Sequence, residues 1–469
     1  MKTKIARIPE PYVGAPALHI PQIAGCSPYK PFLWHVPVTG ERPVTLSVEG
    51  LPVGMILDST TGCITGSAAA GEYQVRITAK NSLGTDEGKM TLLVKGDGLC
   101  QTPLLGWTSW NAFRNTVSDT SVRETARLMA ETGLADYGYR YVNIDSGWQG
   151  EYGGAYDAVQ PNEKFPDMKA LADYVHSLGL CIGIYSTPMT KAWGGGEYPG
   201  CTRNKDHSYI QFIVGEEHYE ANNVNQWVDW GIDYLKYDWT PCMADVADLM
   251  KRELTASRRD FAFCTTVDAK YVDAKYWREN CTSWRHNPDS EDNWDCVCRI
   301  IASADVWMEH MRPGHFFDLD MLETGYYNEH FCQLTEDEQL AAYSIRAFMM
   351  SPIQLSCDLS KLTQFDRDML CNDEIIALNQ DVTGILETKM TETKAGTCRT
   401  RIYTRPLADG GVAAAFFNMG EETADMTLSL DGTYHIRDLW AKENLEDVRG
   451  VLALTLEPHT VRIVKLNKI

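Results

Sequence analysis

Two opposite charges stand near the end of an otherwise apolar segment, residues 231–239, which reads GIDYLKYDW. The β-branched, aliphatic and aromatic residues of this segment are typical of a buried strand. Lys236 and Asp238 lie two residues apart, so both side chains face the same side of that strand. At the carboxyl end of a parallel barrel strand, where active sites are built, such a pair would bind a polar ligand or move a proton. The alternative is a structural ion pair.

Polar and aromatic side chains also end several other apolar segments between residues 105 and 322. If these segments are strands of one closed barrel, their carboxyl ends lie on a single rim. The residues that would meet there are Trp107, Trp110, Asp145, Tyr185, Lys236, Asp238, Arg285, Asp289, Asp318 and Asp320.

Carboxylates, one lysine, one arginine and aromatic rings are the groups that glycoside hydrolysis requires. One carboxylate attacks or stabilises the oxocarbenium-like centre, and a second donates a proton to the leaving oxygen. An aldolase would also use a lysine at a strand end. Lys236 beside Asp238, however, is expected to stay charged rather than act as a nucleophile.

The segments that carry these residues alternate with amphipathic helices, which predicts βαβ units and a parallel sheet. Residues 168–178 show one apolar helical face followed by Gly179, and Thr335 with Glu338 forms a capping box that opens a helix through Phe348. Eight strand–helix units in this length predict an α/β fold, a (β/α)8 TIM barrel. The predicted strands are Leu105–Trp110, Tyr141–Trp148, Cys181–Ser186, Ile232–Trp239, Phe261–Val267, Thr282–His286, His315–Leu322 and Ile353–Leu359.

Both flanks of the barrel are predicted to be β-structure. Residues 1–97 contain short alternating strands and resemble the Ig-like β-sandwich modules of bacterial surface and carbohydrate-active proteins. This module shows no ligand constellation and is expected to be dispensable for chemistry. The barrel is expected over residues 98–383. Residues 384–469 read as a C-terminal antiparallel β-sandwich domain, with short strands broken by turns.

The amino-acid composition restricts the kinds of molecule that this protein can bind and the compartment in which it works. The net charge of -21 makes nucleic acid and anionic membranes unfavourable partners and fits a small neutral ligand. No signal peptide and no run long enough to span a membrane is visible. Fourteen cysteines without framework spacing favour a reducing cytoplasm, and the close pair Cys296 and Cys298 lacks the second half of a metal site. Neither a metal nor a cofactor is expected, and a homo-oligomer stays open.

At this point the barrel resembles glycoside hydrolase family 27, the α-galactosidases and α-N-acetylgalactosaminidases. The likeness extends from about residue 103 to 465 and so includes the C-terminal domain. The matching segments are 105–113 (LGWTSWNAF), 141–145 (YVNID), 164–175 (KFPDMKALADYV), 183–185 (GIY), 230–238, Trp284-Arg285 with Asp289, 318–322 (DLDML) and 379–381 (NQD).

The resemblance implies roles for individual residues. Asp238 corresponds to the catalytic nucleophile and Asp289 to the acid/base of a retaining exo-glycosidase that needs no metal. Their carboxylates are therefore expected about 5–5.5 Å apart. Trp110 corresponds to the aromatic wall against the sugar. The residues that correspond to ligands of the sugar hydroxyls are Asp145, Tyr185, Lys236, Arg285 and Asp320.

Three positions that would also contact substrate depart from the family pattern. Ser146 stands where a second aspartate usually grips the O4 and O6 side of the sugar. Thr240 and Trp193 occupy the places of a disulfide often found beside the site. The end of the fifth strand, 264–267, lacks the expected polar or acidic specificity residue. The catalytic pair is intact, whereas the sugar-recognition shell is altered.

The substrate predicted first is a terminal α-linked galactose. A β-L-arabinopyranoside or an α-N-acetylgalactosaminide, hydrolysed by the same mechanism, is the alternative that the altered shell leaves open. A non-catalytic carbohydrate-binding protein on this scaffold is the more distant alternative, because that route usually loses the nucleophile or the acid.

Overall fold

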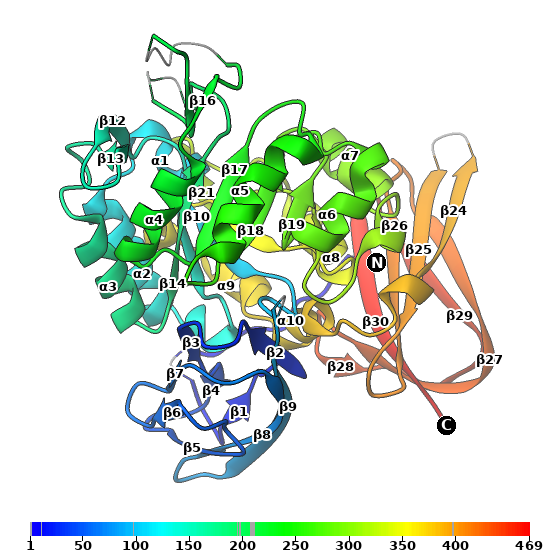
Figure 1. The fold of residues 1–469 in the computed structure, drawn as a ribbon. Coiled ribbons are helices and arrows are strands. Elements are labelled where there is room, and N and C mark those ends of the chain that lie inside the picture. Colours follow the sequence, from blue (N-terminus) through cyan, green and yellow to red (C-terminus); the bar gives the residue numbers. More distant parts are fainter. Residues whose placement is uncertain are drawn as a thin grey trace.

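The computed structural model describes residues 2–10, 12–96, 98–194, 196, 198–206, 212–395 and 398–469, apart from the side chains of Ala395 and Cys398. A barrel of parallel strands and helices forms the centre (Figure 1). The N-terminal β-module lies against one end of it, and the C-terminal sheet lies along one side. The predicted fold class is confirmed.

Eight parallel strands form the barrel in the order β20-β19-β18-β17-β14-β11-β10-β23. A bridge between Leu322 and Leu355 brings the segment after β20 against β23. All eight predicted strands are present, and most are shorter than predicted because polar loops begin where the side chains leave the apolar core. Their bounds are β10 (Leu105–Thr108), β11 (Tyr141–Ile144), β14 (Cys181–Ser186), β17 (Tyr234–Asp238), β18 (Ala262–Thr266), β19 (Ser283–Arg285), β20 (Phe316–Asp318) and β23 (Ile353–Leu355).

Helices surround this sheet, and the helix start predicted at Thr335 is confirmed. Asp167 caps α3 through the backbone N–H of Ala170, and Thr335 and Glu338 form the predicted capping box of α8. The helices are α1 (Trp110–Phe113), α2 (Asp119–Glu131), α3 (Met168–Ser177), α4 (Glu220–Trp230), α5 (Ala244–Ala256), α6 (Ala274–Asn280), α7 (Trp294–Ser303), α8 (Glu336–Phe348), α9 (Gln364–Leu370) and α10 (Asp373–Gln380).

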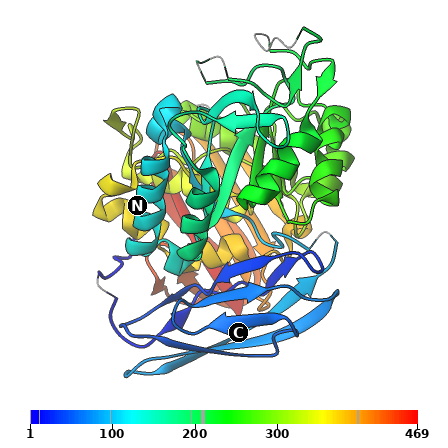
Figure 2. The same cartoon turned by 60° about the vertical axis from the view of Figure 1, so that its left-hand side comes forward.

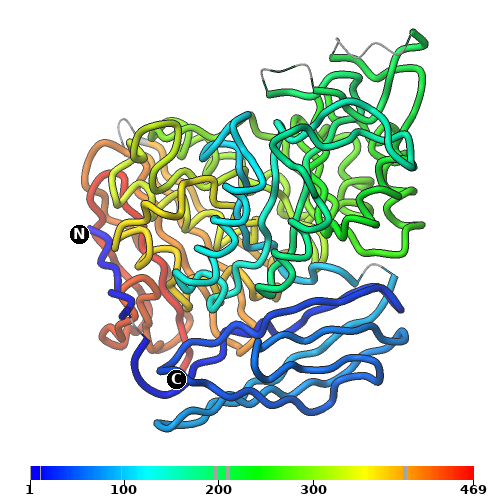
Figure 3. Tube along the Cα trace, turned by 90° about the vertical axis from the view of Figure 1, so that its left-hand side faces the viewer, coloured from blue at the N-terminus to red at the C-terminus, as the bar shows by residue number. Residues whose placement is uncertain are grey.

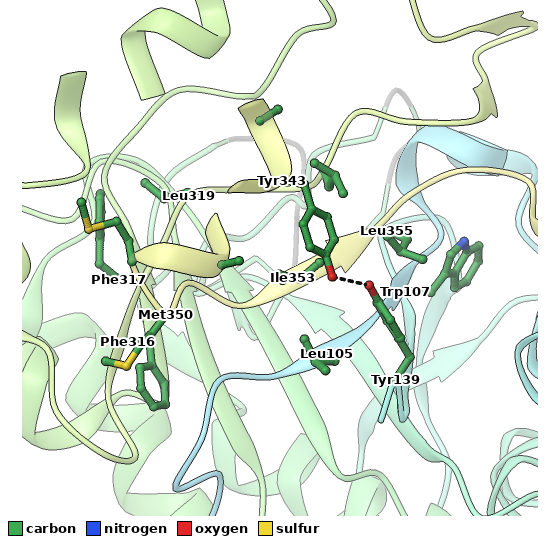
Figure 4. Packing of buried hydrophobic residues seen from close by; sticks show 14 of the residues in the cluster. Leu105, Trp107, Tyr139, Phe316, Phe317, Leu319, Tyr343, Met350, Ile353 and Leu355 are labelled. Atoms are coloured by element: carbon green, nitrogen blue, oxygen red, sulfur yellow. Dashed lines mark hydrogen bonds between the residues drawn. The ribbon is translucent and has the colours of Figure 1, made fainter. Parts of the chain in front are cut away.

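A packed core joins α8 to the first and last barrel strands. Tyr139 and Tyr343 point toward each other and share a hydrogen bond of 3.0 Å between their hydroxyls (Figure 4). Trp107 is fully buried, and its indole N–H donates to the carbonyl of Cys357 at 2.8 Å. Trp107, which the sequence placed at the rim, therefore belongs to the core.

The N-terminal module is a sandwich of a four-stranded sheet, β2-β9-β8-β5, and a three-stranded sheet, β3-β7-β6. It lies under the end of the barrel where the strands begin (Figures 1 and 2). The backbone N–H of Ser27 donates to Asp260 just before β18, and Arg140 just before β11 donates to the carbonyl of Leu33. The module thus contacts the face opposite the strand ends that carry the candidate site. Its strands are β1 (Ala17–Leu18), β2 (Ile23–Cys26), β3 (Phe32–His35), β4 (Val38–Thr39), β5 (Thr45–Glu49), β6 (Met55–Asp58), β7 (Cys63–Gly66), β8 (Gly71–Lys80) and β9 (Thr85–Val94).

The first residues of the chain run between the barrel and the C-terminal domain (Figure 3). The N–H of Ala6 donates to the carbonyl of Trp440 at 2.8 Å, and the N–H of Ile8 donates to Asp368 at 2.8 Å. The N-terminal segment therefore connects three parts of the molecule, a role that its sequence did not reveal.

The C-terminal domain is an antiparallel sheet over a compact apolar core, as predicted. Its strands are β24 (Lys389–Ala395), β25 (Cys398–Pro406), β26 (Val412–Asn418), β27 (Ala424–Asp438), β28 (Glu443–Asn444), β29 (Val448–Leu456) and β30 (Thr460–Lys468). The thirteen cysteines whose side chains the structure describes are free thiols. Among the described residues, no helix combines the length and hydropathy needed to cross a membrane.

Short hairpins follow three of the barrel strands, and β12, β13 and β16 lie at the end of the barrel where the strands finish (Figure 1). They are β12 (Gln149–Gly153) with β13 (Ala158–Pro161), β15 (Thr202–Arg203) with β16 (Glu217–His218), and β21 (Tyr326–Tyr327) with β22 (His330–Phe331).

Candidate active site

A partly buried ion pair joins the ends of two barrel strands that flank β14. Lys236 Nζ on β17 donates to Asp145 Oδ2, after β11, at 2.8 Å. The same oxygen accepts from the hydroxyl of Thr108 at 3.3 Å, and Asp145 Oδ1 accepts from the N–H of Ser146 at 2.8 Å. Burial lowers the pKa of Lys236, but the carboxylates of Asp145 and Asp238 outweigh it and hold that pKa above the ordinary value. The lysine is therefore a fixed cation and a poor nucleophile.

Asp238 is the last residue of β17, and its Oδ1 accepts a hydrogen bond of 3.0 Å from the hydroxyl of Thr266 on β18. Burial raises the pKa of Asp238, against the cations of Lys236 and Arg285, which lower it. The carboxylate thus lies between two cations, with lone pairs left for a reacting carbon. Sequence reasoning judged the end of the fifth strand to lack a polar specificity residue and gave Thr266 no role. Its contact with Asp238 is only visible across the strand pair.

Arg285, at the end of β19, connects the rim to two further carboxylates. Its guanidinium donates to Asp289 Oδ1 at 2.8 Å and forms an ion pair with Asp320. Burial lowers the pKa of Arg285, but the surrounding carboxylates, Asp320 and Asp289 first, raise it further. The side chain of Asp289 is 74% exposed, whereas that of Arg285 is 4% exposed. Asp289 therefore reaches out from a buried cation toward the side from which a substrate would come.

Tyr185 and Trp110 lie beside this network. The hydroxyl of Tyr185 is buried and has no hydrogen-bond partner in the described part of the chain. Burial and the charge of Asp238 raise the pKa of Tyr185, so the hydroxyl keeps its proton for a ligand. Trp110 was predicted to end a strand but begins the short helix α1, because the chain turns after β10. The guanidinium of Arg114 covers its ring at 4.9 Å.

Ser146 and Trp193 contact each other, so the structure leaves neither residue free of protein contacts for binding a substrate. The hydroxyl of Ser146 donates to the carbonyl of Trp193. A Cβ on Gly194 would lie 2.8 Å from Ser146 Oγ, so the loop passes close to Ser146. The Trp193 ring stacks on Phe212 with centroids 4.0 Å apart and is 38% exposed. Thr240 is exposed in the loop after β17.

Two features of the loop after β20 were missed by sequence reasoning. Asp320 has a positive φ of 69°, which is unusual for a residue other than glycine. Glu323 is 5% exposed, and burial raises its pKa to about 8. Glu323 Oε1 accepts from the side-chain amide of Asn111 at 3.0 Å and so anchors the helix that presents Trp110. Neither feature has a sequence signal, because both depend on contacts between distant segments.

Comparisons with known proteins agree with this arrangement. The family described as alpha galactosidase A matches residues 102–381, and the alpha galactosidase C-terminal beta sandwich domain matches residues 397–466. A family of Ig-like domains matches residues 20–95.

Individual relatives extend the match over most of the chain. Alpha-galactosidase 2 of Arabidopsis thaliana is 31% identical over 396 residues, which are 81% of this chain and 93% of the relative. The crystal structure of an α-galactosidase/melibiase candidate from Bacteroides fragilis is 28% identical, covers 97% of this chain and 98% of its own, and has a TM-score of 0.86. A β-L-arabinopyranosidase of Geobacillus stearothermophilus shares the fold, at 23% identity over 78% of this chain and 97% of its own, with a TM-score of 0.69. The chain is a glycoside hydrolase and belongs to the alpha galactosidase A family, glycoside hydrolase family 27.

Proposed function

We propose that this enzyme releases terminal α-linked galactose from oligosaccharides or glycosides with net retention of configuration. The observation that carries the proposal is the half-buried Asp238 carboxylate close to the cations of Lys236 and Arg285, with Asp289 on the guanidinium of Arg285. A retaining glycosidase needs one carboxylate held ionised against the anomeric carbon and a second that is free to exchange a proton. The two cations near Asp238 suit it to the first role, and the exposure of Asp289 suits it to the second.

In the first step, an oxygen of Asp238 attacks the anomeric carbon and the glycosidic bond breaks. Asp289 gives its proton to the leaving oxygen, and a glycosyl ester of Asp238 forms. In the second step, water attacks the same carbon while Asp289 takes a proton from it. The sugar leaves, and the Asp238 carboxylate is restored. Lys236 and Arg285 oppose the effect of burial on the pKa of Asp238 before attack, and they stabilise the carboxylate again as it departs.

Sugar recognition falls to the charges and hydroxyls around Asp238. The pair of Lys236 and Asp145 offers one donor and one acceptor to adjacent hydroxyls, and charge-assisted hydrogen bonds of this kind are the strong ones. The hydroxyl of Tyr185 has an unused proton, and Trp110 offers an apolar ring to one face of the sugar.

A β-L-arabinopyranoside is the second candidate, and one observation favours it. The hydroxyl proton of Ser146 is used by the carbonyl of Trp193, and the backbone N–H of Ser146 is used by Asp145. Position 146 therefore offers neither donor nor charge to a galactose O6. L-Arabinopyranose keeps the ring hydroxyl pattern of galactose and lacks the C6 group, so it loses nothing at this position.

We also propose that the enzyme works in the cytoplasm, because its fourteen cysteines show no disulfide framework. Fractionation of the source cells would test this proposal, and recovery of the enzyme outside the cytoplasm would contradict it.

The mechanism is tested with an aryl α-galactoside and NMR of the first anomer formed. Retention is expected, and an inverted product would overturn the roles of both carboxylates. A 2-deoxy-2-fluoro glycoside with an activated leaving group slows the second step and should accumulate the ester. Peptide mapping should then find the label on Asp238, and a label on any other residue would contradict the assignment.

A further inference from the structure

Arg346 is a buried arginine on α8 with unusual partners. It is 1% exposed, and its guanidinium forms no ion pair with any carboxylate in the described part of the chain. Burying a cation without a counter-ion is costly unless other groups replace the water around it. Here the replacements are backbone carbonyl oxygens.

Three consecutive carbonyls of the loop after β20 point at this guanidinium. Nε donates to the carbonyl of Asp320 at 3.1 Å, and one terminal nitrogen donates to those of Leu319 at 2.9 Å and Met321 at 2.8 Å. The central residue of the three, Asp320, is the one with a φ of 69°. Backbone in this conformation is strained for a residue other than glycine and persists only when its surroundings fix it. The hydrogen bonds from Arg346 contribute to that fixation, together with those from the N–H of Asp320 to Asp318 and from the N–H of Leu319 to Ser351.

The same loop carries the carboxylate that meets the active-site arginine. Asp320 forms an ion pair with Arg285 through one oxygen and accepts the N–H of Ser290 at 2.7 Å through the other. Arg346 also donates to the hydroxyl of Ser290 at 3.2 Å, and Ser290 directly follows Asp289. One side chain therefore contacts both loops that deliver Asp320 and Asp289 to the rim.

We propose that Arg346 is a positioning residue that holds the Asp320 loop and Ser290 in the arrangement that binds the sugar and presents Asp289. The inference rests on the proposed function for the roles of Asp320 and Asp289. Arginine suits the task because its rigid, planar set of five donors can serve several acceptors at once. Lysine brings three donors on one atom and cannot reach four oxygens in these directions.

The experiment compares Arg346→Met and Arg346→Lys with the control Arg405→Met. Arg405 is also fully buried, and it also donates to backbone carbonyls, those of Leu378, Asp381 and Thr383. Its partners lie at the junction with the C-terminal domain, away from the rim. Both methionine variants should lower Tm. Only the Arg346 variants should raise KM for an aryl glycoside, by about tenfold or more, because coupled groups lose their interaction together.

A double-mutant cycle with Asp320→Asn separates positioning from general stability. If Arg346 acts through Asp320, then Arg346→Met should add little to KM once Asp320 is replaced, whereas independent effects would multiply. Arg346→Lys should lie between wild type and Arg346→Met in KM. Multiplying effects, or an Arg346→Met enzyme whose KM matches that of Arg405→Met, would overturn the inference.

Failure of this inference and failure of the proposed function would give different experimental results. If the wild type hydrolyses aryl glycosides with inversion, the proposed mechanism fails whatever the variants do. If Arg346→Met proves too unstable to purify, Arg346→Lys and Asp320→Asn still complete a cycle with their double variant. In that cycle too, multiplying effects on KM would overturn the inference.

Discussion

Two aspartates lie at the two ends of β17, one just before the strand and one as its last residue, and their carboxylates have opposite surroundings. Asp233, just before the strand, is paired with His176 at 2.8 Å and with Arg259, and accepts the N–H of Ile182 at 3.0 Å. Asp238, the last residue, accepts one hydrogen bond, from Thr266, within the described chain. Both carboxylates lie near an arginine. Asp233 accepts from several hydrogen-bond donors, whereas Asp238 accepts from one.

The pKa shifts follow this difference. Burial raises the pKa of Asp233, but the hydrogen bond from His176 and the charge of Arg259 outweigh it, and the pKa is held below its ordinary value. Burial raises the pKa of Asp238, and its neighbouring cations do not cancel that effect. Saturation with donors stabilises a fold, whereas an under-satisfied buried charge is costly and is kept where it meets a ligand. The comparison separates a structural aspartate, just before β17, from a chemical one at the end of that strand.

The largest expected effect is on activity and comes from Asp238→Asn. We expect kcat/KM to fall by roughly 10⁴-fold or more, because the nucleophile of the covalent step is lost. Stability should be equal or higher at neutral pH. The folded pKa of Asp238 is raised, so the stability it contributes is complete below the unfolded pKa and is lost as pH rises through the folded pKa. Asparagine cannot ionise and avoids that loss. Thermal unfolding and kinetics on an aryl glycoside test both statements. A large drop in Tm would show that Asp238, like Asp233, has a structural role.

Asp289→Ala is expected to have a smaller effect that depends on the substrate. General acid catalysis contributes about 10²–10⁴-fold, and its loss matters most for leaving groups that need a proton. We therefore expect the glycosylation step to slow strongly for a disaccharide and little for an activated aryl glycoside. Added azide should rescue turnover of the aryl substrate, since an anion needs no general base to attack the ester. Equal losses on both substrates would show that Asp289 is not the proton donor.

Much of this site was predictable because it depends on local patterns. The two-residue spacing of Lys236 and Asp238 and the ends of eight apolar segments identify a rim of charged groups without any coordinates. The capping box at Thr335 depends on residues three apart, and the structure has it as predicted.

What could not be predicted depends on contacts between distant segments. Thr266 reaches Asp238 across a strand pair, and Ser146 reaches Trp193 across a long loop. The four loop oxygens around Arg346 come from positions 25 to 56 residues away in sequence. No periodicity carries such information, because it arises only when the barrel closes.

The next effect is on stability and comes from Asp233→Asn, the matched control for Asp238→Asn. Removing one partner of a fully buried ion pair costs about 3–5 kcal/mol, because the charge left behind stays unpaired. The side chains of Asp233, His176 and Arg259 are 15%, 21% and 17% exposed, so we expect a smaller cost, about 1–3 kcal/mol. The folded pKa of Asp233 is lowered, so its contribution is complete above the unfolded pKa and is lost as pH falls through the folded pKa. The stability gap between wild type and variant should therefore narrow in acid. The kcat of folded enzyme should not change, and a loss of kcat equal to that of Asp238→Asn would remove the distinction between the two ends of β17.

The smallest expected effect concerns specificity, at a hydroxyl that the structure shows to be occupied. Ser146 donates to the carbonyl of Trp193, and an aspartate there would face that carbonyl with a charge instead of a proton. The loop at Gly194 would have to move, since it passes close to Ser146. A carboxylate would then be free to hold a galactose O6, and a hydrogen bond to a charged group is worth about 1.5–3 kcal/mol. We expect Ser146→Asp to shift the ratio of kcat/KM for aryl α-galactoside over aryl β-L-arabinopyranoside upward by about tenfold. Ser146→Ala removes the contact with Trp193 without adding a charge, so it should leave the ratio near that of wild type. If Ser146→Asp and Ser146→Ala give the same ratio, the charge at position 146 does not read the sugar, and the arabinopyranoside loses the observation that favours it.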